Sequence, residues 1–541
     1  MTEPKLATTR QNAQRSPGTQ DLSFERDRIP TSVLDRPIAS VSIGWFAIAS
    51  AVTLVGAFLL RFILLDAYTL TQREGAWAYN AWSFYVGKPI PGGESLPLIA
   101  PLFLILEALS FFLFGVTDAI ARTLPALVGL GMVALILALR PFFSRSSIAG
   151  MMVLIALSPT LVFASRTVDP TILMAFFALL GVVSTLRSGL QPDSRSLGWP
   201  FALGAAIGGM FASGPAGISA ILAAGTGLVV ATMSNAGWTE DGYRNPVRQG
   251  FRAIARDQAS IVALLGGFAG TVVLAFTRLL SDPAALEGIL TTFSEWGQMM
   301  ATETSETPTQ FFLYAVLLYE FLAVVFAVVA VMTAPRNDAG SDSSRPLQPT
   351  VFLAWFIAAL LLHSLAAGRQ PEHTVFVALP LVLLGGVGLG RMAERIPWRA
   401  LATTRSGLVP VALLGLVIGV LAVVTLIARS NDVGAAVPGE PSSIVQVGFV
   451  LLVVVVPLGI LVAREFLSRR GAQYVGWASL LVLATILGIY TVRTTTELAY
   501  VRADSGRELL AQRVPTEGVR AFVDQTSRLS RDLSLTDVSN V

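Results

Sequence analysis

Cysteine is absent from the 541 residues of this chain. A disulfide framework, a thiolate nucleophile and a zinc site with thiolate ligands are therefore excluded. The chain has two histidines, His363 and His373, so a metal site built on several histidines is excluded too. Charged residues make up 13% of the sequence and hydrophobic residues 53%. These proportions argue against a water-soluble globular domain.

Long apolar runs fill most of the chain, and the mean hydropathy is +0.67. Windows of about 20 apolar residues have the length needed to cross a bilayer. They predict an all-α polytopic membrane protein with about 13 transmembrane helices and external juxtamembrane helices. The predicted spans are 41–64, 119–139, 147–164, 170–186, 198–213, 215–233, 259–280, 311–334, 350–367, 373–390, 406–427, 444–463 and 475–492.

The basic residues indicate which side of the membrane each loop faces. The apolar segment 98–115 is the doubtful span, because counting it would reverse the side of every later loop. If it stays on the outer surface, most arginines fall in cytoplasmic loops, as the positive-inside rule requires. The N-terminus is then cytoplasmic and the C-terminal tail extracytoplasmic. The basic residues that give the pI of 9.3 are thus explained by the topology. No nucleic acid is expected as a partner, because no aromatic stacking platform accompanies the scattered arginines.

Three regions follow from this topology. Residues 1–39 are polar and predict a disordered cytoplasmic tail. Residues 40–492 form the multi-spanning membrane domain, with a first external loop over 66–118 and a further external loop over 281–310. Residues 493–541 form a short extracytoplasmic tail, in which apolar residues at helical spacing predict an amphipathic helix.

Charged residues in the external loops are the candidates for chemistry. An enzyme that transfers a group from a lipid phosphate needs a carboxylate to activate the acceptor or to hold a metal ion, and cations to neutralise the phosphate. Glu74 and Asp169 are the candidate catalytic carboxylates and the candidate ligands of a divalent ion, Mg²⁺ or Mn²⁺. The candidate phosphate-binding residues are Arg73, Lys88, Arg122, Arg166, Arg369 and His373.

Each candidate also has a structural interpretation. Arg73 and Glu74 can simply solvate an interfacial loop. Arg166 and Asp169, three residues apart, can pair with each other at a helix end. Arg369 and His373 can belong to a hydrophilic turn around Pro371. Inside the predicted spans, we expect His363 to make a structural hydrogen bond and Glu320 to face a cavity.

The order of short motifs resembles that of the GT-C superfamily, whose members are multi-spanning glycosyltransferases that use lipid-phosphate sugars. The family's acidic pair in the first external loop corresponds to Arg73-Glu74, and its Arg-x-x-Pro-Ala-Leu element to residues 122–127. Ala100-Pro101-Leu102 and Phe114-Gly115 match the elements between them. Within the superfamily the sequence is most similar to flippase-activity-associated proteins of archaeal-type glycosylation clusters, which are protein mannosyltransferase-like.

This resemblance implies a membrane glycosyltransferase that moves a sugar from a polyprenyl-phosphate donor to a glycan, lipid or protein acceptor on the outer face of the membrane. The first acid of the family's pair, implied to be a base or metal ligand, is Arg73 in this chain. The alternative is therefore a diverged, non-catalytic partner of the same fold that binds or flips lipid-linked glycans. A secondary transporter is a third hypothesis, but the two matching halves typical of many transporters are not visible.

Overall fold

The computed structural model describes residues 44–88, 99–190, 197–234, 245–302, 307–334, 349–396, 398, 410–420, 456–466, 471–503, 508–511, 522 and 525–530. Over these residues the chain is helical and contains no β-strand, as predicted. The chain divides into two compact units, residues 1–45 and 46–541, and the second is described below. The tail predicted over 1–39 lies outside the described residues, and so does most of the predicted C-terminal helix, of which 525–530 are helical.

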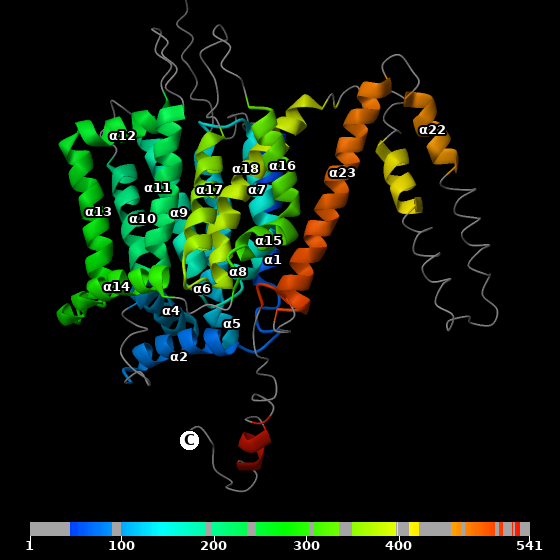
Figure 1. Ribbon diagram of the computed structural model, residues 1–541. Helices are drawn as coiled ribbons and strands as arrows, with labels where there is room; N and C mark the ends of the chain where they lie inside the picture. The colour runs from blue at the N-terminus through cyan, green and yellow to red at the C-terminus, as the bar shows by residue number, and fades with distance from the viewer. Residues whose placement is uncertain are drawn as a thin grey trace, which may run out of the picture. The chain divides into compact units, whose positions relative to one another are not determined.

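Figure 1 shows the described helices in order along the chain. In chain order they are α1 (Trp45–Phe62), α2 (Gln72–Val86), α4 (Pro101–Phe114), α5 (Asp118–Ala121), α6 (Thr123–Leu135), η2 (Ile136–Leu139), α7 (Arg145–Leu157), α8 (Pro159–Ala164), α9 (Thr171–Ser188), α10 (Gly198–Ala212), α11 (Ala216–Ser234), α12 (Pro246–Arg256), α13 (Gln258–Phe276), η3 (Pro283–Glu287), α14 (Gly288–Ala301), α15 (Phe311–Tyr319), α16 (Phe321–Met332), α17 (Thr350–Leu365), η4 (Pro371–His373), α18 (Thr374–Arg395), α22 (Val456–Phe466), α23 (Gly471–Thr496) and the π-helix η7 (Glu497–Val501).

The structure confirms a multi-pass membrane protein but does not confirm the number of spans. Among the described residues, seven helices are long and apolar enough to cross a bilayer, or eight if the bent pair α15 and α16 forms one span. The seven are Trp45–Phe62, Asp118–Leu139, Thr171–Ser188, Ala216–Met233, Gln258–Phe276, Pro371–Arg395 and Ala478–Val501. Helices α10 and α17, predicted as spans, have 15 and 16 residues. Much of the predicted spans 406–427 and 444–463 lies outside the described residues.

Two predicted spans are interrupted. Segment 147–164 breaks at Ser158, because Pro159 begins a new helix and the Ser158 hydroxyl caps it. Segment 311–334 bends by 94° at Glu320. Glu320 Oε1 accepts hydrogen bonds from Ser158 Oγ at 2.6 Å and from the Thr160 amide at 3.0 Å. The cavity role expected for Glu320 was wrong, because this side chain is buried and occupies the N-terminus of α8.

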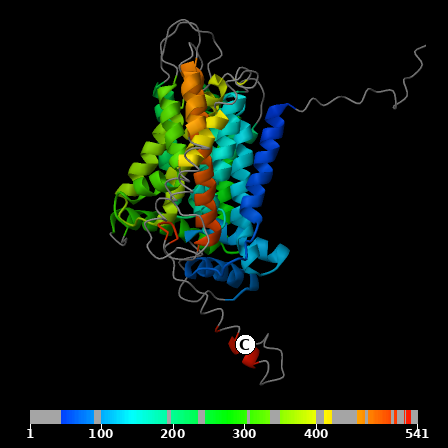
Figure 2. The ribbon, with the colours of Figure 1, turned by 90° about the vertical axis from the view of Figure 1, so that its right-hand side faces the viewer.

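Glycines set the closest helix contacts. A Cβ on Gly386 in α18 would collide with the backbone of Met151 in α7, and one on Gly208 in α10 would lie 2.9 Å from the Phe268 carbonyl of α13. Small residues at such crossings let helix backbones approach closely. Helix α18 is the most enclosed candidate span, with 89% of the window in 371–395 buried (Figure 2 shows the helices side by side).

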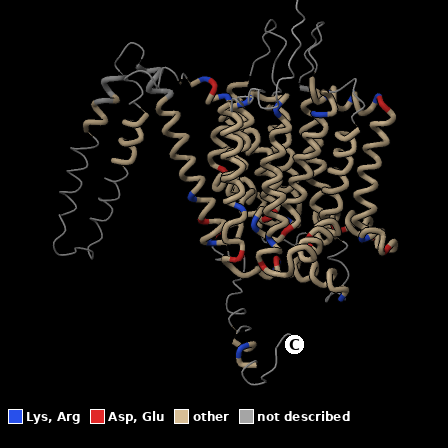
Figure 3. Tube along the Cα trace, turned by 180° about the vertical axis from the view of Figure 1, so that it is seen from behind, with Lys and Arg blue, Asp and Glu red and all other residues tan. Residues whose placement is uncertain are grey.

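The polar elements collect at one end of the helices. Helices α2 and α14 lie across that end in Figure 1, close to α4 and α5. Charged residues are concentrated toward the helix ends, with few along their middles (Figure 3). The region expected as a loop over 281–310 contains η3 and the amphipathic helix α14. The doubtful segment 98–115 contains α4, which has 14 residues and is about 21 Å long, too short to cross about 30 Å of hydrocarbon.

Candidate functional site

Helix α2 carries the pair Arg73-Glu74, and its start is fixed by its own sequence. Thr71 accepts a hydrogen bond from the Glu74 amide, while the Glu74 carboxylate accepts one from the Thr71 amide at 2.9 Å. This reciprocal arrangement is a capping box. Gly87 ends the helix with φ of 69°, a left-handed conformation that glycine adopts without strain. The helix that carries the pair is therefore defined at both ends.

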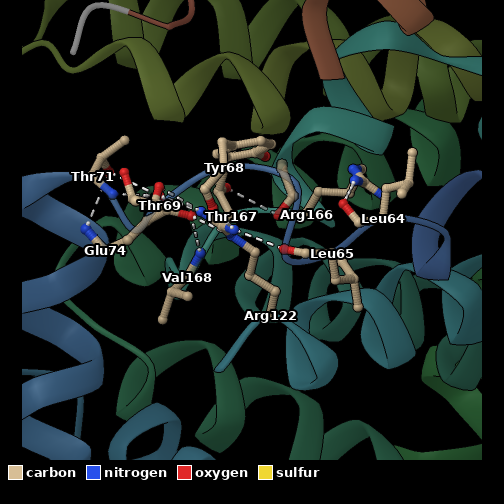
Figure 4. A network of polar contacts seen from close by, with 11 residues as sticks. Leu64, Leu65, Tyr68, Thr69, Thr71, Glu74, Arg122, Arg166, Thr167 and Val168 are labelled. Carbon is tan, nitrogen blue, oxygen red and sulfur yellow. Dashed lines mark hydrogen bonds and ion pairs between the residues drawn. The ribbon is translucent and has the colours of Figure 1, made fainter. Parts of the chain in front are cut away.

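Glu74 is bound within a dense network (Figure 4). Its Oε1 accepts from Arg122 Nε at 3.1 Å and from the Val168 amide at 3.2 Å. Its Oε2 accepts from Arg122 Nη2 at 3.1 Å and from the Thr71 amide and hydroxyl, both at 2.9 Å. Arg122 also donates to the carbonyls of Leu65, Tyr68 and Thr69. The two side chains form a buried ion pair, with 1% of Glu74 and none of Arg122 exposed.

This environment gives Glu74 a clear structural role. Its two oxygens already accept five hydrogen bonds from the chain, and Glu74 does not line the large cavity described below. The ion pair joins α2 to the start of α6, and the hydrogen bond from the Val168 amide joins α2 to the segment before α9. The catalytic and metal-binding roles expected of Glu74, and the phosphate role expected of Arg122, stay predictions.

Arg166 holds the end of α1. Its Nη1 donates to the carbonyls of Arg61 and Ile63 at 3.1 and 2.7 Å, and its Nη2 donates to that of Leu64 at 2.8 Å. Leu64 leaves the helix with φ of 54°, an uncommon conformation for a residue with a side chain. The predicted pairing of Arg166 with Asp169 was wrong, because Asp169 pairs with Arg73 instead.

A cavity of about 430 Å³ lies where six segments meet. Its walls come from α2, residues 99–100 before α4, the start of α9 with residues 169–170, the α10–α11 turn, α14 and the turn before α18. Its size is within the range of small-molecule sites. The predicted residues that it brings together are Arg73, Asp169 and His373. The lining residues are Arg73, Ala76, Trp77, Ile99, Ala100, Asp169, Pro170, Thr171, Met174, Ser213, Gly214, Pro215, Ala216, Glu295, Gln298, Met299, Thr302, Gly368, Gln370 and His373.

Arg73 links the two sides of this cavity. Its Nη2 lies 3.2 Å from Asp169 Oδ2 and donates to Gln370 Oε1 at 3.0 Å, and its Nη1 lies 3.3 Å from Glu372 Oε1. Burial lowers the pKa of Arg73, but the charges of Asp169 and Glu372 outweigh burial and raise this pKa above its usual value. The side chain is still 38% exposed. Arg73 is therefore a fixed cation with one face open.

Asp169 is fixed by its own segment. Its Oδ1 accepts from the Thr171 amide at 2.9 Å and from the Thr171 hydroxyl at 2.7 Å. Its Oδ2 is the oxygen that faces Arg73. Since 3% of the Asp169 side chain is exposed, the carboxylate is held in a single orientation beside the cavity.

Two other predicted cations lie outside the cavity lining. Arg369 donates from Nε to the Thr307 carbonyl at 2.8 Å and from Nη1 to the Ala366 carbonyl at 2.8 Å, so it organises the turn before α18. Lys88 lies 5.1 Å from the centre of the Trp82 ring at the end of α2. Neither arrangement tests a phosphate role, which stays a prediction for both.

Several residues at the site, Gln370 among them, were not predicted from the sequence. Glu372 neighbours the predicted His373, and its charge in an external turn was a usable signal. Glu295 and Gln298 lie on α14, where polar and apolar residues alternate at helical spacing, and this pattern was visible in 281–310. Trp77 lies one turn after Arg73. If residues 72–86 are predicted to be helical, Trp77 is therefore expected on the same helical face as Arg73.

The site does not fit a divalent ion as it stands. The described residues contain no group of three or more His, Asp and Glu side chains that could hold a metal. Asp169 Oδ2 and Glu372 Oε1 both face the Arg73 guanidinium, which would repel a cation placed between them.

Known structures with a similar fold were found, although no sequence match was. No protein-family model and no curated protein matches the sequence. The crystal structure of ArnT from Cupriavidus metallidurans bound to undecaprenyl phosphate aligns with a TM-score of 0.52 at 22% identity, over 86% of this chain and 79% of ArnT. The apo structure of ArnT aligns over the same shares at 22% identity, with a TM-score of 0.50. AglB from Archaeoglobus fulgidus aligns with a TM-score of 0.42 at 12% identity, over 80% of this chain and 56% of AglB, and we draw no inference from it.

At 22% identity the alignment with ArnT shows a shared fold, and the superfamily resemblance of the short motifs stays a prediction. The likeness to flippase-activity-associated proteins stays a prediction. This chain has the fold of ArnT.

Proposed function

We propose that the protein is a membrane glycosyltransferase that moves a sugar from a polyprenyl-phosphate donor to an acceptor on the outer face of the membrane. The observation that carries the proposal is the pairing of a fixed carboxylate, Asp169, with a fixed cation, Arg73, in one cavity at the ends of the helices. The match to a fold that binds undecaprenyl phosphate in ArnT supports the lipid-phosphate class of donor.

The reaction needs a base and a cation close together. The acceptor hydroxyl attacks the anomeric carbon, the bond between that carbon and the phosphate oxygen breaks, and the lipid phosphate leaves with the bonding electrons. Asp169 takes the acceptor proton on Oδ2, the oxygen that makes no hydrogen bond to its own segment. Arg73 neutralises the leaving phosphate, since its contacts to Asp169, Glu372 and Gln370 use three of its five N–H groups.

The walls of the cavity suit a lipid-linked sugar. Trp77 offers an aromatic face, and Glu295 and Gln298 from α14 add polar groups on the same lining. Helix α14 is amphipathic and lies across the ends of the upright helices, as an interfacial helix would. In this proposal the cavity faces the outside, with the N-terminus cytoplasmic and the tail after residue 492 extracytoplasmic.

A second candidate is a protein that binds or flips lipid-linked glycans without transferring the sugar. The ion pairs of Arg73 favour it, because they restrain Asp169, and an arginine occupies position 73, where the resemblance implies an acid. Both candidate functions involve the same lipid-linked donor, and they differ in whether the protein transfers its sugar.

The full chain in lipid nanodiscs tests both functions. We expect undecaprenyl phosphate to bind and a radiolabelled polyprenyl-phosphate sugar, drawn from a panel, to transfer its label. Asp169→Asn should reduce transfer at least about 100-fold, the lower range for losing a general base, while binding of undecaprenyl phosphate stays within about twofold of wild type. Asp282→Asn, which alters a partly exposed pair with Arg278, is the matched control. Binding without label transfer selects the second candidate, and absence of binding rejects both.

A further inference from the structure

Three oxygen atoms from two distant segments converge on Arg73. Asp169 Oδ2 comes from the segment before α9, while Gln370 Oε1 and Glu372 Oε1 come from the turn before α18. The contacts are 3.2, 3.0 and 3.3 Å long. Two carboxylates and an amide carbonyl are the ligand types that Mg²⁺ and Mn²⁺ use in proteins. A guanidinium lies where these oxygens meet.

The charges at this point leave no place for a divalent ion while Arg73 is present. Arg73 contributes one positive charge against the two negative charges of Asp169 and Glu372, and an added divalent ion would be repelled by the guanidinium. Glu372 Oε2 is buried and has no hydrogen-bond partner, and Asp169 Oδ2 has no partner other than the ion pair. Removal of the guanidinium would therefore leave two carboxylates that need another cation or a proton.

We propose that Arg73 is a built-in cation that takes the place of a divalent metal ion, so that this protein binds its anionic substrate without metal. The resemblance to the superfamily implied a metal ligand or base at position 73, and the arginine supplies the positive charge itself. The corollary is that Asp169, Gln370 and Glu372 form a latent divalent-cation site that opens when the side chain of Arg73 is removed. The identity of the anionic substrate rests on the proposed function, whereas the latent cation site does not.

Mn²⁺ binding to the full chain in nanodiscs tests the latent site without any assay of activity. The probe is Mn²⁺ alone, followed by the loss of its free electron paramagnetic resonance signal. We expect no site below millimolar concentration in wild type, and about one Mn²⁺ per chain at least tenfold more tightly in Arg73→Ala. Arg73→Ala combined with Asp169→Asn should lose this site. Arg73→Lys, which keeps a positive charge, should not gain it.

A matched control and a conservative variant keep the test decisive. Arg278→Ala removes an arginine that pairs with a single carboxylate, Asp282, at 3.5 Å, so it should gain no Mn²⁺ site. Arg73→Met keeps much of the volume of the side chain and replaces the alanine variant if that one does not fold. Mn²⁺ binding in wild type that Asp169→Asn removes would overturn the proposal. So would the absence of a gained site in a folded Arg73→Ala or Arg73→Met protein.

Substrate binding supplies an independent arm. Binding of undecaprenyl phosphate to wild type should change less than twofold when EDTA is added. Arg73→Ala should bind it at least tenfold more weakly in EDTA and recover part of the loss with Mn²⁺. If wild type binds no undecaprenyl phosphate, the proposed donor is wrong, and the Mn²⁺ measurements still decide whether Arg73 stands in for a metal. A dependence of wild-type binding on Mn²⁺ contradicts the built-in cation.

Discussion

Substitution of Glu74 separates a structural role from a catalytic one. Glu74→Ala leaves the Arg122 charge buried and removes the acceptor of five hydrogen bonds. Breaking a buried ion pair in this way costs about 3–5 kcal/mol. Arg122 keeps three backbone carbonyls, so we expect the lower part of this range, about 3 kcal/mol. Glu74→Gln should cost about 1.5–3 kcal/mol, the range for hydrogen bonds to charged groups.

The measurement is the free energy of unfolding in mixed micelles, with sugar transfer assayed on the same preparations. Glu497→Gln is the control, because Glu497 pairs with Arg493 at 2.9 Å while 74% of the Arg493 side chain is exposed. An exposed pair of this kind contributes about 0.2–1 kcal/mol. If Glu74→Gln unfolds at the wild-type denaturant concentration and yet loses transfer, the structural role is refuted and Glu74 is catalytic.

A double variant checks that the cost comes from the ion pair itself. Glu74→Gln and Arg122→Gln together should destabilise by less than the sum of the single changes, by about 0.5–3 kcal/mol. The reason is that the second change removes the charge that the first one leaves unpaired. Additive costs would show that the two side chains act separately, contrary to the contacts in Figure 4.

Three further outcomes follow from buried contacts. Glu320→Ala should lower the free energy of unfolding by about 1–3 kcal/mol, because the Ser158 hydroxyl and the Thr160 amide lose their acceptor. Glu320→Gln, which keeps an oxygen, should recover most of this loss in the same denaturation assay. Gly386→Val should cost about 1–3 kcal/mol by overpacking α18 against α7, and a stability equal to wild type would contradict the crossing. Arg166→Lys should speed hydrogen exchange at 61–65, since an ammonium cannot form the forked contacts to three carbonyls.

Hydropathy predicts much of the fold, because a helix needs a long run of apolar residues to cross the lipid bilayer. The predicted spans 119–139, 170–186 and 215–233 differ by no more than two residues at either end from the helices at 118–139, 171–188 and 216–234. Hydropathy does not report where a span breaks. The break at Ser158 depends on a proline and a cap, and the bend at Glu320 depends on a carboxylate that reaches that cap. These contacts join residues 162 positions apart, so local patterns carry no information on them.

The candidate site was predictable only in part. Of the predicted site residues, Arg73, Asp169 and His373 line one cavity, whereas Glu74, Arg166 and Arg369 do not line it. Arg166 and Arg369 face backbone carbonyls, which sequence cannot distinguish from a phosphate, because both present oxygen acceptors to arginine. Glu74 carried a local signature that favoured its structural interpretation. Thr71 and Glu74 have the spacing of a capping box, and such a glutamate turns back toward the start of its own helix.

The pair Arg73-Glu74 is adjacent in sequence but cannot act as a pair in space. Successive residues on a helix point about 100° apart, so neighbours do not face one target. Glu74 turns inward to Arg122, and Arg73 turns to the cavity, where Asp169 supplies the carboxylate from another segment. The arginine at position 73 therefore changes the cavity without disturbing the role of Glu74. Its charge acts on Asp169 and Glu372 and its Nη2 donates to Gln370, so we expect any effect of position 73 on sugar transfer to pass through these three contacts or through the phosphate itself.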